Sequence, residues 1–136
     1  MILVDASVWI DFFNGKPCAP ADELERLLDD ASAPVAIADL TLYEVLRGFR
    51  AEKDALAAQR LLAALEVIDV GGEDNARSAV DHFRALRRLG YTNNSIADVM
   101  LASYCIAHDH ALLHADQDFD AFAQHRGLKV WQGPAH

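Results

Sequence analysis

The chain has 136 residues, of which 52% are hydrophobic, and carries a net charge of −9 at pH 7. This length suits one domain, spanning residues 1–136, with a sizeable buried core. The excess of acid argues against binding of nucleic acid through a broad basic surface and suits a basic protein partner. The apolar runs are too short to cross a bilayer and no basic segment precedes the first one, so we expect no membrane association and no signal peptide. Two cysteines without CxxC spacing are consistent with a reducing cytoplasm.

Short apolar runs alternate with amphipathic segments along the chain. In chain order, these patterns predict a strand over 2–5, helices over 7–13 and 21–31, a strand over 35–37, helices over 40–49 and 52–65, a strand over 67–70, helices over 73–89 and 95–108, a strand over 111–114, a helix over 117–125 and a strand over 128–131. Asp39 is placed to cap the helix after it, and Gly90 to end the helix before it.

This alternation favours an α/β fold. Continuous apolar runs are typical of parallel strands whose sheet is covered on both faces. In such sheets ligands bind beyond the carboxyl ends of the strands. Asp5 and Asp116 both follow a predicted strand, so the sequence places them at that edge.

Four acids, far apart in sequence, are the candidate functional residues: Asp5, Glu44, Asp98 and Asp116. Glu44 and Asp98 lie in largely apolar helical segments, where a lone charge is costly without a partner. Carboxylates that face one cleft repel one another, which usually implies a bound divalent cation. Oxygen ligands without thiolates favour Mg²⁺ or Mn²⁺ over zinc. The pattern therefore predicts metal-dependent chemistry on phosphate esters.

Taken alone, each acid has a simpler interpretation. Asp5 can cap the helix that follows it, and Glu44 can pair with a neighbouring arginine. Asp98 completes a capping box that begins at Ser95. Ser7 could hydrogen-bond the Asp5 carboxylate or a metal-bound water, or only help to start its helix. The case for a site rests on the acids as a set.

The segment after Asp116 is also acidic. Asp116, Asp118 and Asp120 have the spacing that begins a calcium loop, but the downstream Gly and Glu of that motif are missing. Asp118 can add to the metal site or order its water, whereas Asp120 is interpreted as a solvated helix residue.

The basic residues form two groups rather than an even spread. They are Arg47, Arg50 and Lys53 in the first group, and Arg77, Arg84, Arg87 and Arg88 in the second. Each group could contact phosphates, but any single arginine among them is interpreted first as part of a solvated helix face.

Histidine and aromatic residues add little to this pattern. His108, His110 and His114 straddle a helix end and a strand, so their rings should diverge and they are interpreted as surface or loop residues rather than a zinc site. Four aromatic residues are interpreted as core rather than as platforms for base stacking: Trp9, Tyr43, Phe119 and Trp131.

The ordered motifs resemble those of PIN-domain proteins, and specifically of VapC-type toxins of bacterial toxin–antitoxin pairs. The matching segments are residues 2–10, 44–48, 96–102 and 112–120. They occur in the order of that family and span nearly the whole chain. One departure is Asn94, which stands about where many members carry a basic residue.

The resemblance implies a Rossmann-like three-layer α/β/α sandwich with a central parallel sheet. It further implies a Mg²⁺- or Mn²⁺-dependent ribonuclease, usually dimeric, that a cognate VapB-like antitoxin neutralises by inserting a segment near the active site. Carried over by position, the catalytic quartet is Asp5, Glu44, Asp98 and Asp116, and Asp118 matches a further acid that many members have.

The resulting hypothesis is metal-assisted hydrolysis of an RNA phosphodiester bond. Asp5, Asp98, Asp116 and Asp118 would hold the metal, while Ser7 and Arg47 would support the site or the substrate. One alternative is phosphoryl transfer through an aspartyl-phosphate on Asp5, although phosphatases of that type require an acid where Ser7 stands. Another is a PIN module that binds RNA or protein without cutting.

Two predicted helices, over 21–31 and 52–65, carry more leucine than a small core needs. Part of their surface is expected to form a homodimer and a groove for an antitoxin helix, with simple core packing as the alternative.

Overall fold

A computed structural model describes residues 1–92 and 94–133. Its centre is a sheet of five parallel strands in the order β3-β2-β1-β4-β5. The strands are β1 (Ile2–Val4), β2 (Val35–Ala38), β3 (Glu66–Ile68), β4 (Ala111–Leu113) and β5 (Lys129–Val130).

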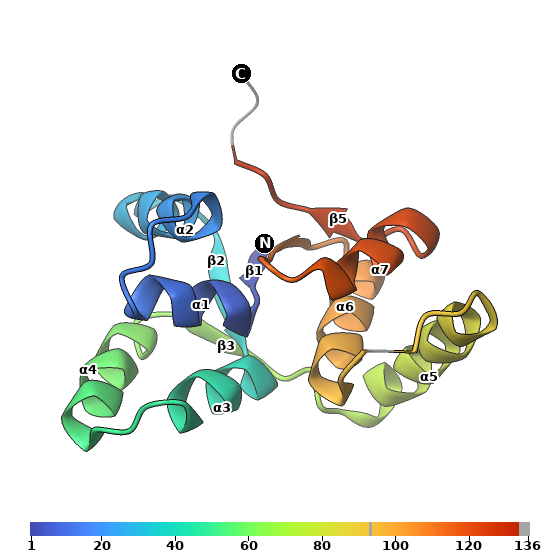
Figure 1. Cartoon of the computed structure of the whole chain (residues 1–136), viewed down its shortest axis with the longest axis horizontal. Helices are drawn as coiled ribbons and strands as arrows, with labels where there is room; N and C mark the ends of the chain where they lie inside the picture. The colour runs from blue at the N-terminus through green and yellow to red at the C-terminus, as the bar shows by residue number, and fades with distance from the viewer. Residues whose placement is uncertain (93, 134–136) are drawn as a thin grey trace.

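Helices cover both faces of the sheet, so the α/β/α sandwich expected from the sequence is present (Figure 1). On one face lie α1 (Ala6–Phe13), α2 (Ala19–Asp29), α3 (Asp39–Arg47) and α4 (Glu52–Leu62). On the other lie α5 (Glu73–Arg88), α6 (Ile96–His108), the 3-10 turn η1 (Gln117–Phe119) and α7 (Asp120–His125).

The strands divide their side chains between two hydrophobic cores. Ile2 and Val4 point into the core under α1 to α4, whereas Leu3 points into the core under α5 to α7. This follows from the alternation of side chains along a strand. The central strands β1, β2 and β4 are apolar throughout because both of their faces are covered, which is why they were recognisable in the sequence. The edge strands β3 and β5 include the exposed residues Glu66 and Lys129.

The predicted elements all occur, with changes at their ends. The predicted helix over 117–125 divides into η1 and α7. Gly90 follows α5 with a φ of 94°, and the amide of Tyr91 donates to the carbonyl of Leu86, so α5 ends in a Schellman motif as predicted. Among the described residues, none of the helices is long and apolar enough to cross a membrane.

Asp39 does not cap α3 as predicted. Ala38 is the N-cap residue, and Asp39 already lies in the first turn. Its Oδ1 accepts hydrogen bonds of 2.9 Å from the amides of Leu40 and Val70. The side chain thus ties the start of α3 to the segment after β3, a long-range contact that the local sequence does not reveal.

The prediction that Tyr43 belongs to the core is wrong. Trp9 and Phe119 are fully buried, but Tyr43 is 64% exposed. The reason is helical geometry: α3 buries Thr41 and Val45, which are one turn apart, and Tyr43 lies between them on the opposite face.

Candidate metal centre

The paired strands β1 and β4 bring two distant parts of the chain together. Val4 and Leu113 are partners in the parallel register, so the residues after them leave the sheet side by side. The amide of Asp5 continues the pairing by donating to the carbonyl of Leu113, at 2.9 Å. The carboxyl ends of these central strands therefore form the floor of the site.

Ser7 holds this floor together. Its hydroxyl donates to Oδ2 of Asp5 at 2.6 Å and accepts from the amide of Ala115 at 3.1 Å. The amide of Ser7 donates to the same Asp5 oxygen at 3.1 Å, so Asp5 is the N-cap of α1, as the simpler interpretation had it. Asp5 is only 4% exposed, and its side chain has little freedom to move.

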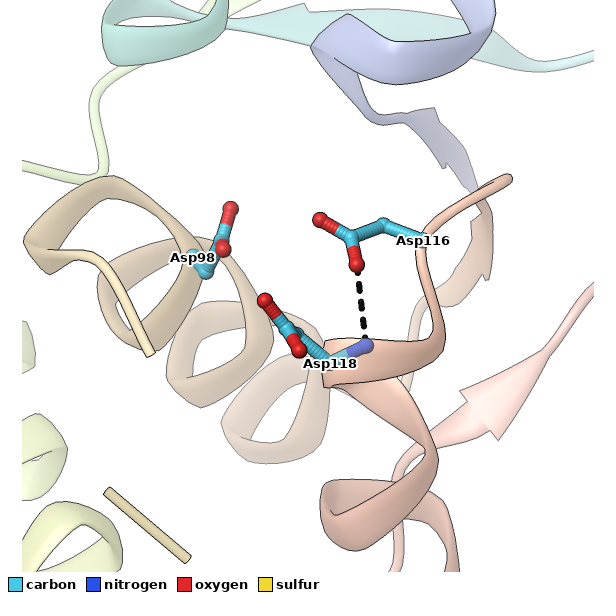
Figure 2. A group of neighbouring side chains, drawn as sticks. All are labelled: Asp98, Asp116 and Asp118. Atoms are coloured by element: carbon cyan, nitrogen blue, oxygen red, sulfur yellow. Dashed lines mark hydrogen bonds between the residues drawn. The ribbon is translucent and has the colours of Figure 1, made fainter. Parts of the chain in front are cut away.

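Three further carboxylates converge beside this floor. Asp98, Asp116 and Asp118 each offer one oxygen such that the three oxygens lie within 4.8 Å of one another. Figure 2 shows the three side chains directed toward a common space, Asp98 from α6 and the other two from the segment around η1. Carboxylate oxygens at this spacing fit one divalent cation, which would bridge groups that otherwise repel each other.

Local hydrogen bonds explain why these side chains converge. Oδ1 of Asp116 accepts from the amide of Asp118 at 2.9 Å, which turns the chain into η1 and sets the two acids on one side. The Ser95 hydroxyl accepts from the amide of Asp98 at 3.1 Å, which places Asp98 in the first turn of α6. Helix starts of this kind favour negative charge, so both turns suit the acids they present.

Asp5 and Glu44 are not members of the close group of three, but they share its electrostatic environment. Burial raises the pKa of Asp98 from its ordinary value of 3.8 to about 6, and the charges of Asp5, Asp116 and Glu44 add to the increase. Burial likewise raises the pKa of Asp5, with a smaller contribution from Asp116. Burial and then the charge of Asp5 raise the pKa of Glu44. The four acids of the predicted quartet therefore act on one another.

Arg47 lies at the rim of this group. Its charge lowers the pKa of Glu44, in opposition to burial, so the two side chains are neighbours on α3. The guanidinium carbon stands 5.4 Å from the centre of the Tyr43 ring. Asn94 lies farther round the rim and lines a cavity that also borders Asp118.

The histidines do not converge on a zinc site, in agreement with the sequence interpretation. His108 stacks on Tyr104 and, at 6.0 Å between ring centres, on His110, whereas His114 lies against Phe119. His114 has a role that sequence reasoning missed, because its Nδ1 accepts from the amide of Asp116 at 3.3 Å. Its position two residues before Asp116 was visible in the sequence, but the direction of its ring was not.

Comparisons with known proteins agree with this architecture. The PIN domain family model matches residues 2–124. Ribonuclease VapC11 of Mycobacterium tuberculosis is 33% identical over 130 residues, which cover 96% of this chain and 97% of that protein. DNA-bound VapBC from Salmonella typhimurium has a similar fold, with a TM-score of 0.73 and 18% identity over 96% of each chain. VapC20 of M. tuberculosis, described as a sarcin-ricin loop cleaving toxin, gives a TM-score of 0.68 and 22% identity over 89% of this chain and 94% of that one.

The raised pKa of Asp98 leads to a prediction for metal binding. Metal binding requires the ionised carboxylate, so protons compete with the ion below the Asp98 pKa of about 6. Mn²⁺ should stabilise the protein near pH 7 by about 2.7 kcal/mol at a hundred times its Kd, and this gain should shrink as the pH falls through 6. Thermal unfolding with and without Mn²⁺ across this pH range measures the effect.

In the metal-free protein, the stability that Asp98 contributes should instead decrease as the pH rises. A carboxyl whose folded pKa lies above 3.8 loses stability on ionisation, so the contribution of Asp98 declines from about pH 4 to about pH 6. D98N should therefore unfold at a higher temperature than the metal-free parent at neutral pH, and should lose the gain from Mn²⁺. E73Q, which changes an exposed acid on α5, is the matched control. An equal gain from Mn²⁺ in D98N and the parent would contradict the assignment.

Proposed function

The chain belongs to the PIN domain family, and from this premise we propose that it is a metal-dependent endoribonuclease, the toxin of a toxin–antitoxin pair. The relative at 33% identity is named a ribonuclease, and its match extends over almost the whole of both chains. The observation that carries the proposal is the convergence of Asp98, Asp116 and Asp118 at the carboxyl edge of a parallel sheet. An RNA substrate would place the protein in the cytoplasm. In this proposal the single PIN domain spans residues 1–136.

In this proposal Asp98, Asp116 and Asp118 hold Mg²⁺ or Mn²⁺, and Asp5 and Glu44 complete the site beside them. The ion would supply an activated water and would stabilise charge on the phosphoryl group and the leaving oxygen. Asp5, fixed by Ser7, keeps the strand ends and the segment of Asp116 in register. Glu44, whose pKa is raised by burial, is not one of the three proposed ligands and so would be free to accept or return a proton.

The geometry speaks against phosphoryl transfer through Asp5. A nucleophilic carboxylate needs a free oxygen aimed at the substrate. Asp5 is buried, and one of its oxygens already accepts two hydrogen bonds from Ser7. A binding module without activity is also disfavoured, because such a module gains nothing from a close group of repelling carboxylates.

A groove between α2 and α4 is the proposed binding site for the antitoxin. It has a volume of about 590 Å³ and an apolar floor that includes Phe12, Leu28 and Leu61. Acids stand along the same groove: Glu25, Asp29, Asp30 and Glu66. This combination fits an amphipathic helix with apolar residues on one face and basic residues beside them. Core packing accounts for Leu24, Leu27 and Leu62, which are buried. It does not account for Leu61, which is exposed and lines the groove.

For the homodimer, which the sequence led us to expect on the helices over 21–31 and 52–65, we propose a different surface. Apolar side chains are exposed on α5 and at the start of α6, where Ile96 is 83% exposed and Val80 and Phe83 lie nearby. We propose that a second copy of the chain covers this face, because closed dimers bury the same patch of each subunit. Residues of α2 and α4 then remain free for the antitoxin.

The ribonuclease proposal predicts loss of RNA cleavage in D98N and D116N. Each change replaces a charged carboxylate ligand of the proposed metal by a neutral amide, so the rate of RNA cleavage in Mn²⁺ should fall by about a hundredfold or more. D120N removes an exposed acid just beyond Asp118 and should cleave at the parental rate. Cleavage of total RNA followed by sequencing of the new fragment ends provides the measurement. Parental activity in D98N would sink the proposal.

The antitoxin proposal predicts a difference between two leucines of α4. L61D places a charge in the groove, and should weaken binding of the cognate antitoxin by about tenfold or more. L56D changes an exposed leucine of the same helix that does not line the groove, and should bind as the parent does. Calorimetric titration gives both affinities, and equal losses in the two variants would place the antitoxin elsewhere.

The dimer proposal predicts that V80D is monomeric where the parent is dimeric. A charge at the centre of an apolar interface is left without water or a partner, so association should weaken by at least about tenfold. L89D, at the exposed end of α5, is the control. Light scattering at micromolar protein concentration measures the mass of each, and a monomeric parent would rule out the dimer.

A further inference from the structure

We propose that Tyr43 and Arg47, on the exposed face of α3, bind one nucleotide of a single-stranded RNA beside the acidic site. The ring of Tyr43 stacks on the base, and Arg47 binds a phosphate. This inference rests on the proposed ribonuclease function and names a substrate contact that the carboxylates cannot provide, because they repel phosphate.

Tyr43 is the first observation behind the proposal. It is 64% exposed on a helix whose apolar residues Leu42, Val45 and Leu46 all contact the core. The ring therefore contributes little to the packing of α3. Exposed aromatic rings are the surfaces on which single-stranded RNA bases stack, and such stacking tolerates any base.

Arg47 is the second observation. It lies one helical turn after Tyr43, with its guanidinium carbon 5.4 Å from the centre of the ring, within the range of a cation–π interaction. Among residues 1–92 and 94–133 it forms no ion pair, so its charge is available to a ligand. A guanidinium held against an aromatic ring is also pre-organised to bind phosphate.

The position of the pair relative to the acids is the third observation. Arg47 is close enough to Glu44 to lower its pKa, and the charge of Glu44 in turn acts on Asp98. Figure 1 shows α3 beside the start of α6, and the two helices are in contact. A base on Tyr43 would therefore belong to a nucleotide near the phosphate that the acids face.

The distribution of charge favours this side of the site. Arg50 is exposed and follows Arg47 by three residues, just beyond the end of α3. Lys53 stands between Glu52 and Asp54 in the first turn of α4, and these acids offset its charge. Of the basic group found in the sequence, only Arg47 and Arg50 therefore contribute positive charge here. On a chain with a net charge of −9, such a local positive surface is a suitable approach for an RNA backbone.

The test measures RNA binding apart from cleavage. Variants are made in the D98N background and titrated with short single-stranded RNA of mixed sequence that carries fluorescein and 2-aminopurine. Y43A should weaken binding by roughly 5- to 100-fold and abolish the stacking quench of 2-aminopurine, whereas Y43F should keep both. R47A should weaken binding and reduce the slope of log affinity against log salt by about one unit. R77A removes the same charge from an exposed site on α5 and should stay within about twofold of the background.

The outcomes separate this inference from the ribonuclease proposal. If the wild-type chain cleaves RNA and Y43A binds it within about twofold of the background, the Tyr43 contact is wrong while the function stands. If Y43A instead changes only the mass in light scattering or the affinity for antitoxin, α3 is a protein interface and the inference is overturned. If neither cleavage nor RNA binding is seen in any variant, both proposals fall. Because Tyr43 is exposed, Y43A should fold normally, which its circular dichroism and unfolding temperature will verify.

Discussion

Mutual repulsion among carboxylates is the constraint around which this molecule is built. Asp5, Asp98 and Asp116 each stand at the start of a helical turn: Asp5 and Asp116 cap α1 and η1, and Asp98 lies in the first turn of α6. The free amide N–H groups at these positions stabilise negative charge, so the backbone offsets part of the repulsion without any basic side chain. The pKa of Asp98 is raised first by burial and then by the charge of Asp5, with smaller contributions from Asp116 and Glu44, so part of the repulsion remains. A site organised in this way is stable enough to fold, and a bound cation would stabilise it further.

The sheet supplies the rigidity that such a site requires. Repelling groups stay together only if the elements that hold them cannot move apart. The central pair β1 and β4 is buried on both faces, and Ser7 links the segments that leave the two strands. Asp39 extends the same principle to α3, because it ties the helix that carries Glu44 to the segment after β3. Long-range hydrogen bonds thus stand where the chain leaves the sheet toward the acids: between Ser7 and Ala115, and between Asp39 and Val70.

Most of the fold could be predicted because its signals are local. The apolar strands, the alternation with helices, the Gly90 stop and the capping by Asp5 and Ser95 depend on neighbouring residues only. The acids could be proposed as a set because two follow strands and the others lie on apolar helices. Reasoning failed where the outcome depends on distant contacts or on a small rotation. The bond from Val70 to Asp39 and the ring direction of His114 have no local signature. Tyr43 was misassigned because an aromatic residue beside leucines resembles core unless the rotation of α3 is known.

The acid excess and an RNA substrate are compatible once charge is considered by location. The five acids at the site, Asp5, Glu44, Asp98, Asp116 and Asp118, amount to more than half of the net charge of −9. A divalent ion at that point would offset part of this negative charge and would offer an approaching phosphate a local positive centre. Other acids gather along the α2–α4 groove, on a surface suited to a basic helix rather than to RNA. The same composition that argues against a general nucleic-acid binder thus suits the two proposed partners, a basic helix and an RNA, which differ in the sign of their charge. A basic partner in the groove would also neutralise acids that otherwise repel RNA. Its charge alone would therefore favour binding of the substrate. Inhibition by such a partner thus requires that it block access to the site physically.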